Sequence, residues 1–214
     1  MSTPEHPPSP FDSLRDKRAL VDTGAGPIAF VVVYAIFGLH TAAAVAVGIG
    51  IALAVERVIR GKPVINAIAG LFGTGLAAFI AVKSGKAETY FVPKLLQQLG
   101  LFVVFAGSVV IRRPLTGYII AQFYRADPDW VKLPPVKRVM TEYTLAWAAL
   151  FGFRAAVYGV LIASGRVGWL AVASIAMGLP AFGALIFLGF RYVPRRLAQL
   201  GAPDPRHAEP EATP

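Results

Sequence analysis

The stretch TGAGPIAFVVVYAIFGLHTAAAVAVGIGIALAV, residues 23–55, contains no Asp, Glu, Lys or Arg over 33 positions. A helix that crosses the hydrocarbon core of a bilayer needs about 20 apolar residues. As a single helix this stretch would be about 50 Å long, against a core of about 30 Å. We therefore expect a tight hairpin that breaks at residues 38–41. There Gly38 can close the first helix and Thr41 can cap the second.

Further apolar runs follow, and the composition agrees with them. Residues 63–82, 95–111 and 167–190 carry no charge, and residues 143–165 carry one, Arg154. Hydrophobic residues make up 56% of the 214-residue chain and charged residues 15%. Soluble proteins have roughly 45–50% and about 25%, respectively. The pattern predicts an all-α fold, a polytopic transmembrane helix bundle.

The basic residues indicate the number of spans and their orientation. With six spans and a cytoplasmic N-terminus, 16 basic residues lie in cytoplasmic segments, and Arg154 lies within the membrane. The other 4 lie in outer loops or at their ends: Lys83, Lys86, Lys94 and Arg166. With a single span over residues 23–55, the best split is 13 against 7. Cytoplasmic loops carry an excess of Lys and Arg. The distribution therefore favours six spans with both the N- and C-termini cytoplasmic.

The expected organisation has three parts. Residues 1–20 and 198–214 are predicted to be disordered cytoplasmic tails, and residues 21–197 are predicted to form the six-helix transmembrane domain. The approximate spans are 23–39, 41–57, 63–83, 94–112, 140–164 and 167–191. Pro180 is expected to kink the last span near Ala176, because proline cannot donate a backbone hydrogen bond.

Small residues recur at helical spacing on two of the spans. They are Ala44, Gly48 and Ala52 on the second span, and Gly70, Thr74 and Ala78 on the third. Such spacing lets helices approach closely in lipid. We expect these faces to pack within the monomer, with dimerisation through one of them as the alternative.

The loop after the fourth span contains a short apolar stretch, residues 114–124, bracketed by Arg112-Arg113 and Arg125. It is too short to cross a bilayer. One interpretation is an interfacial helix in the cytoplasmic leaflet; the other is an extension of the fourth span. In the first case the side chains directed toward lipid are Leu115, Tyr118 and Ile119.

Few residues of the sequence are of the kinds that catalysis or metal binding requires. The chain has no cysteine and three scattered histidines, so we predict no disulfide, metal site or cofactor. No paired acidic residues lie inside the spans and no catalytic motif is found, so an enzyme is the less favoured class. The net charge of +9 is concentrated at span ends. That pattern indicates contact with the bilayer and with anionic headgroups at the cytoplasmic face, and no nucleic acid partner.

Arg154 is the centre of the predicted binding site. A charge at bilayer depth is costly, so it usually has a partner or a task. Helical spacing places Tyr143, Trp147 and Tyr158 on the same face as Arg154, and we expect that face to point into the bundle. Tyr34 and Thr74 are candidate partners from other spans. The predicted binding residues are Arg154, Tyr158, Trp147, Tyr143, Tyr34 and Thr74.

Two functions are compatible with such a site. The first is a structural or interaction protein associated with the cell envelope, with a membrane-protein partner or a homodimer. In it, Arg154 is held by carbonyls and hydroxyls of neighbouring helices. The second is a small-molecule or lipid-binding transporter, or an intramembrane enzyme, in which Arg154 binds an anion such as a lipid phosphate. Tight packing around Arg154 favours the first, and a water-accessible cavity favours the second.

Four segments of the chain resemble a known family. They are RGKPVINAIAGLFGTGLAAFIAVKSGKAETYFVPKLL (Arg60–Leu96), RRPLTGYI (Arg112–Ile119), LAWAALFGFRAAVYGVLI (Leu145–Ile162) and GLPAF (Gly178–Phe182). Over roughly residues 20–197 the chain resembles an actinobacterial family of polytopic inner-membrane proteins, domain-of-unknown-function family 3159. The resemblance implies a multi-pass, six-helix protein of the bacterial plasma (inner) membrane. It supplies no substrate and no catalytic residue.

The chain is also distantly similar to the intracellular septation protein A family. The shared features are the short first helical hairpin, the step Lys62-Pro63 and the step Arg113-Pro114-Leu115. This similarity implies a role in envelope integrity or division. Arg154 in mid-membrane departs from that family's pattern.

Overall fold

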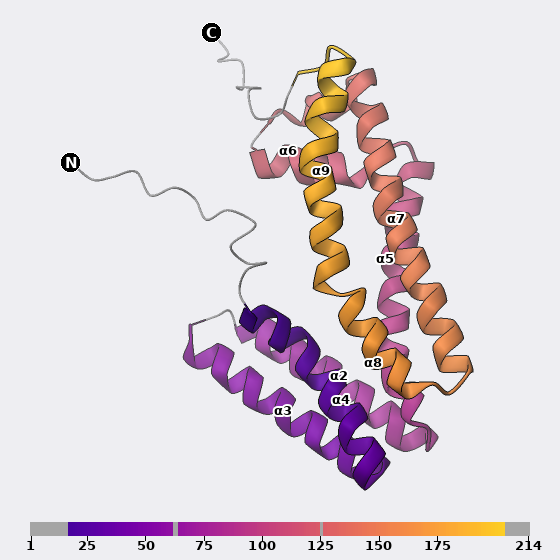
Figure 1. Ribbon diagram of the computed structural model, residues 1–214. Helices are drawn as coiled ribbons and strands as arrows, with labels where there is room; N and C mark the ends of the chain where they lie inside the picture. The colour runs from indigo at the N-terminus through magenta and orange to yellow at the C-terminus, as the bar shows by residue number, and fades with distance from the viewer. Residues whose placement is uncertain (1–16, 62–63, 125, 204–214) are drawn as a thin grey trace, which may run out of the picture. The chain divides into compact units, whose positions relative to one another are not determined.

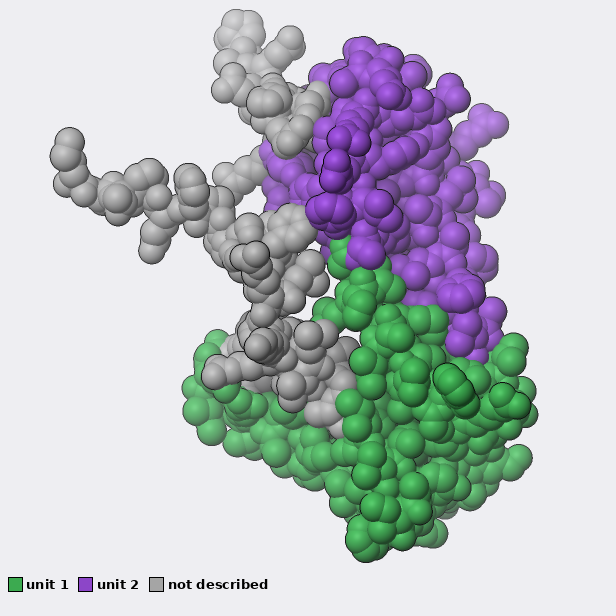
Figure 2. Space-filling model, in the orientation of Figure 1, with its two compact units in different colours: residues 1–93, 158–183 green, residues 94–157, 184–214 purple. Residues whose placement is uncertain are grey.

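The computed structural model describes residues 17–61, 64–124 and 126–203. Residues 1–16 and 204–214, which make up most of the two predicted tails, lie outside the described residues. In the described part the chain is helical and forms no strand, so the all-α prediction is confirmed there. The chain divides into two compact units (Figure 2). The first comprises residues 1–93 and 158–183, and the second comprises residues 94–157 and 184–214.

The first unit is built on the predicted hairpin (Figure 1). In it, α2 (Lys17–Phe37), α3 (Leu39–Ile59) and α4 (Val64–Ser84) pack each on the next. Gly38 separates α2 from α3 with a φ of 81°, a conformation that favours glycine. The break therefore lies where the sequence predicts it. The predicted cap is wrong, because Gly38 stands at the N-cap of α3 and Thr41 lies inside the helix.

Two further elements complete the first unit. A 3₁₀ turn, η1 (Ala87–Phe91), packs on α4, and α8 (Val167–Ala176) packs on α2 and η1. Phe30 of α2 stacks on Tyr90 with ring centroids 4.0 Å apart, and it meets Phe91 edge-on at 6.5 Å. All three rings are buried, so aromatic contacts join α2 to η1.

The small-residue face predicted on α3 points away from the described core. Ala44, Gly48 and Ala52 are exposed. The contact face instead carries Ala46, which is fully buried, and Gly50, where a Cβ atom would lie 3.4 Å from the Thr74 methyl group. The monomer-packing prediction is thus wrong for α3. Two residues along a helix correspond to about 200°, so the two faces lie on opposite sides of it.

The second unit contains α5 (Val92–Val110) from Lys94 onward, α6 (Leu115–Tyr124), η2 (Pro128–Lys132) and most of α7 (Pro134–Ala163) and α9 (Leu179–Gln199). Within it α5, α7 and α9 run along a common direction and α6 lies across them (Figure 1). A buried cluster joins α6, η2, α7 and α9. Its members are Ala121, Ala126, Trp130, Val131, Val136, Val139, Met140, Val193 and Leu197.

The helix α6 is separate from α5. Between them Arg112 adopts a φ of 57°. The Arg113 N–H donates to the Ser108 carbonyl at 2.8 Å, and the Leu115 N–H donates to the Ser108 hydroxyl at 3.3 Å. The path from α5 to α6 therefore contains a fixed turn. An extension of the fourth span would have required one continuous helix.

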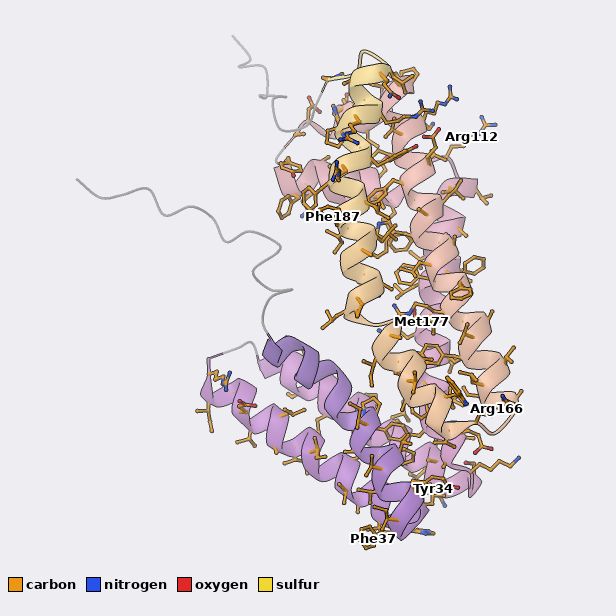
Figure 3. The ribbon with its side chains drawn as sticks, in the orientation of Figure 1. Tyr34, Phe37, Arg112, Arg166, Met177 and Phe187 are labelled. Atoms are coloured by element: carbon orange, nitrogen blue, oxygen red, sulfur yellow. The ribbon has the colours of Figure 1, made fainter. Side chains whose placement is uncertain are left out.

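The last helical segment is interrupted, as predicted for Pro180. The helix α8 ends at Ala176 and α9 begins at Leu179, with Met177 at the interruption (Figure 3). Pro180 then lies in the first turn of α9, where its missing N–H removes no helical hydrogen bond. In a continuous helix the Ala176 carbonyl would have lost that donor. The kink near Ala176 is confirmed as a break between two helices.

Four helical segments are long and apolar enough to cross a membrane. They are Leu39–Glu56, Ala87–Val110, Pro134–Ala163 and Val167–Gln199. Two shorter apolar helices, Pro27–Phe37 and Ile68–Ser84, accompany them in the described part of the chain. Several helices exceed their predicted spans, and the largest extensions are in three of them: α2 begins at Lys17, α7 begins at Pro134, and α9 ends at Gln199. Apolar runs predict the part of a helix in lipid, whereas its polar ends can extend beyond.

Candidate functional site

The predicted binding residues are divided between the two units. Tyr143, Trp147 and Arg154 belong to the second unit, and Tyr34, Thr74 and Tyr158 belong to the first. The boundary passes through α7, between Val157 and Tyr158.

Arg154 is enclosed by protein. It is 3% exposed, so the prediction that it faces inward agrees with its burial. Its positive charge acts on the ammonium group of Lys94 in α5, and the two cations repel each other. The sequence interpretation assigned Lys94 to an outer loop and missed this neighbour. A second buried polar residue, Gln98, lies one turn further along α5, on the same face as Lys94.

Gln98 is one of two polar residues that α5 buries; the other is Ser108. Gln98 is 3% exposed, and its Oε1 atom accepts no hydrogen bond from the described residues. A buried acceptor without a donor costs free energy, so such a group is unusual in a packed core. The spacing of Lys94 and Gln98, four residues apart, is the sequence signal that places both on one face of α5.

Tyr143 and Trp147 are used in packing. The Tyr143 hydroxyl donates to the Leu185 carbonyl of α9 at 3.3 Å, and its ring lies directly against Gly189. The Trp147 ring lies between Phe105 of α5, at 6.2 Å, and Phe151, at 5.8 Å. These contacts join α7 to both of its neighbours. They explain why large aromatic residues occupy this face.

The residues of the first unit are likewise engaged with their neighbours. Tyr158 is fully buried, and its hydroxyl donates to the Ser174 hydroxyl of α8 at 3.2 Å. Thr74 donates to the Gly70 carbonyl of its own helix at 3.1 Å. Tyr34, near the end of α2 (Figure 3), is 37% exposed and stacks with Phe30 at 6.3 Å.

A buried threonine pair, which the sequence interpretation missed, fixes α6 to α7. The hydroxyls of Thr116 and Thr144 lie 2.7 Å apart, and both also lie within hydrogen-bond distance of the Met140 carbonyl, at 3.2 and 2.7 Å. Both side chains are buried. Such a pair has no sequence signature, because its members are 28 positions apart and threonine is common in helices of this kind.

We expect Thr116→Val and Thr144→Val each to lower the free energy of unfolding by about 1 kcal/mol, the usual net value of one hydrogen bond. The double variant should lose less than the sum, because both single changes remove the same bond. The measurement is denaturant titration of the purified protein. Thr141→Val is the matched control, since Thr141 bonds only to Lys137 of its own helix. Strict additivity would contradict the role of the pair.

Charged groups gather where α7 and α9 meet in the second unit. The Tyr192 hydroxyl donates to the Glu142 carboxylate at 2.5 Å, and Arg138 and Arg196 approach the same carboxylate at 3.5 and 3.7 Å. On η2, Lys132 pairs with Asp129 at 2.6 Å, and this hydrogen bond raises the pKa of the Lys132 ammonium. Among the described residues no group of three His, Cys, Asp or Glu side chains could hold a metal ion.

The helical content and the four long apolar helices define this chain as a helical protein suited to a membrane. Over residues 16–199 it matches the family described as Protein of unknown function (DUF3159), and the chain belongs to that family. The comparisons with curated proteins and with solved structures found no match. The family resemblance drawn from four sequence segments is confirmed. An actinobacterial origin and a relation to septation proteins stay predictions.

Proposed function

We propose that the chain is a six-span protein of the plasma membrane, with both termini cytoplasmic, that acts as a structural or interaction protein of the cell envelope. Six apolar helical segments follow one another along the described chain, and the two shortest of the six, Pro27–Phe37 and Ile68–Ser84, belong to α2 and α4. The split of 16 basic residues against 4 supports the orientation.

One observation carries the choice of a structural role. The tyrosine hydroxyls of the predicted binding face donate hydrogen bonds to neighbouring helices: Tyr143 donates to Leu185 and Tyr158 donates to Ser174. Arg154 itself is almost completely buried. A ligand site needs polar groups directed at the ligand. Groups already bonded to neighbouring helices instead hold those helices together.

The topology is testable because the chain has no cysteine. Single cysteines at positions 40, 86 and 166 should react with an impermeant maleimide from outside intact cells. A cysteine at position 129 should react only after lysis. Position 129 serves better than 130, because Trp130 is buried and donates to the Pro203 carbonyl at 2.8 Å. External labelling at 129 would overturn the orientation.

The structural role is testable by genetic complementation. A strain without this protein should admit more of a dye such as ethidium, because its envelope is weakened. Arg154→Leu should restore the barrier as well as the wild-type protein does, since the packing contacts of Tyr143 and Tyr158 remain. Failure of Arg154→Leu to complement, with normal abundance in the membrane, would contradict a purely structural role.

A second candidate function places an anion at Arg154, with Lys94 of α5 as a further cation. A charged group buried in an apolar segment is stabilised by a group of opposite charge. The anion would be a phosphate, either free or on a lipid headgroup, and the protein would then be a small-molecule or lipid-binding transporter or an intramembrane enzyme. Arg154 and Lys94 would be its ligands.

A further inference from the structure

The helix α6 has an exposed face that is mostly apolar. Tyr118, Ile119, Gln122 and Phe123 are exposed, and we call these residues the α6 surface. Ile119 is 52% exposed and Phe123 is 66% exposed, values similar to those of Val103 and Val110 on the apolar helix α5. A polar helix face would be expected if α6 lay in water.

The opposite face of α6 is fixed to the protein. Thr116, Gly117 and Ala121 are buried, and the Thr116 hydroxyl is bonded to α7. A Cβ atom at Gly117 would lie 2.8 Å from Val131, so the helix sits directly on its neighbours. The α6 surface therefore cannot turn inward, and it must be covered by something else.

The position of α6 along α5 indicates what covers it. The 19 residues of α5 extend about 29 Å, close to the thickness of a bilayer core of about 30 Å. The turn at Ile111–Pro114 then carries two exposed cations, Arg112 and Arg113. A helix that lies across α5 directly after this turn is at the level of the lipid headgroups.

The residues that flank α6 in the sequence also indicate a position at the lipid headgroups. Arg112 and Arg113 would attract anionic headgroups, while Ile119 and Phe123 would enter the acyl boundary. The next element, η2, carries the exposed ion pair of Asp129 and Lys132, which indicates the aqueous side. A protein partner would not explain why basic residues and apolar residues adjoin in this order.

We propose that the α6 surface is seated in the headgroup–acyl boundary of the bilayer, held there by anionic lipid at Arg112 and Arg113. This proposal rests on the six-span membrane protein proposed above, since it needs α5 to cross the bilayer. The partner is lipid, and the surface sets the depth of the second unit.

The test uses single cysteines at 119, 123 and 129 that carry an environment-sensitive fluorophore. The full chain is reconstituted in phosphatidylcholine vesicles, with and without phosphatidylglycerol. Positions 119 and 123 should be quenched by spin-labelled lipid and protected from aqueous iodide, whereas 129 should show the reverse. Phosphatidylglycerol should move the fluorophores at 119 and 123 deeper into the bilayer, seen as stronger quenching by spin-labelled lipid. The double change Arg112→Gln with Arg113→Gln should abolish that effect.

Two results would overturn the proposal. Ready iodide quenching at 119 and 123 in both vesicle types would place the surface in water. Protection in native membranes but not in pure lipid vesicles would identify a protein partner instead. Maleimide labelling at 40, 86, 166 and 129 tests the six-span topology separately, so failure of the lipid contact is distinguishable from failure of the topology.

Discussion

Replacing Gly117 with alanine is expected to lower the free energy of unfolding by about 1–2 kcal/mol. A Cβ atom there would lie 2.8 Å from Val131 Cγ1 and 3.0 and 3.2 Å from Met140 Cγ and Cβ. All of these atoms belong to buried side chains. Overpacking of this kind costs about 1–3 kcal/mol, and the better helix propensity of alanine returns up to about 1 kcal/mol. Denaturant titration of the purified protein measures the net effect.

The matched control for this change is Gly100→Ala in α5. Beyond the neighbouring backbone of its own helix, no atom of the described residues lies within 4 Å of a Cβ at Gly100. This variant should therefore gain helix propensity without a clash. The difference between the two glycine variants isolates the contact of α6 with Val131 and Met140. If Gly117→Ala were as stable as Gly100→Ala, α6 would not sit against η2 and α7 as described.

Local backbone chemistry explains what the sequence could predict of the fold. Gly38 in the middle of a long charge-free run predicts a helix break, and the left-handed φ of 81° at that position is the reason. Pro180 predicts a break near Ala176, because a proline cannot donate to the carbonyl one turn earlier. Both signals act within a few residues, so no knowledge of tertiary packing is needed to use them.

The face of a helix that is buried, and the helices that it contacts, could not be predicted in the same way. The small residues of α3 recur at four-residue spacing on two opposite faces. The sequence interpretation chose Ala44, Gly48 and Ala52, whereas Ala46 and Gly50 lie on the buried side. Lys94 was assigned to a loop by its position at a span end. Its electrostatic contact with Arg154 depends on how α5 and α7 pair, which periodicity within each helix does not encode.

In the candidate site, too, one feature could be predicted from the sequence and others depend on how the helices pack. The burial of Arg154 follows from the cost of a charge in lipid, which can be argued from sequence. The partners of Tyr143 and Tyr158, by contrast, are a backbone carbonyl of α9 and a serine of α8. Every residue has a backbone carbonyl, and serine is common. Such partners become visible only when the helices are placed together.

Arg154→Lys is expected to destabilise the protein by about 3 kcal/mol, near the lower end of the cost of leaving a buried charge without its partners. A lysine keeps the charge, but it has a compact ammonium group in place of the planar guanidinium fork. Arg154→Leu should stay within about 1 kcal/mol of the wild-type protein, because it removes the charge together with its desolvation cost. Denaturant titration of the wild-type protein and of the two variants ranks their free energies of unfolding. A leucine variant less stable than the lysine variant would contradict this account.

Arg154→Leu, together with Lys94→Met, decides between the two candidate functions. A ligand that binds the folded state at a hundred times its Kd adds about 2.7 kcal/mol to the free energy of unfolding. For a structural protein, inorganic phosphate and phosphatidic acid should add nothing beyond what chloride of equal ionic strength adds. If the wild-type protein gains stability and both Arg154→Leu and Lys94→Met lose that gain, an anion lies between these two cations, and the structural role gives way to anion binding. A gain from phosphatidic acid alone would identify the anion as a lipid, whereas a gain from both would identify phosphate itself.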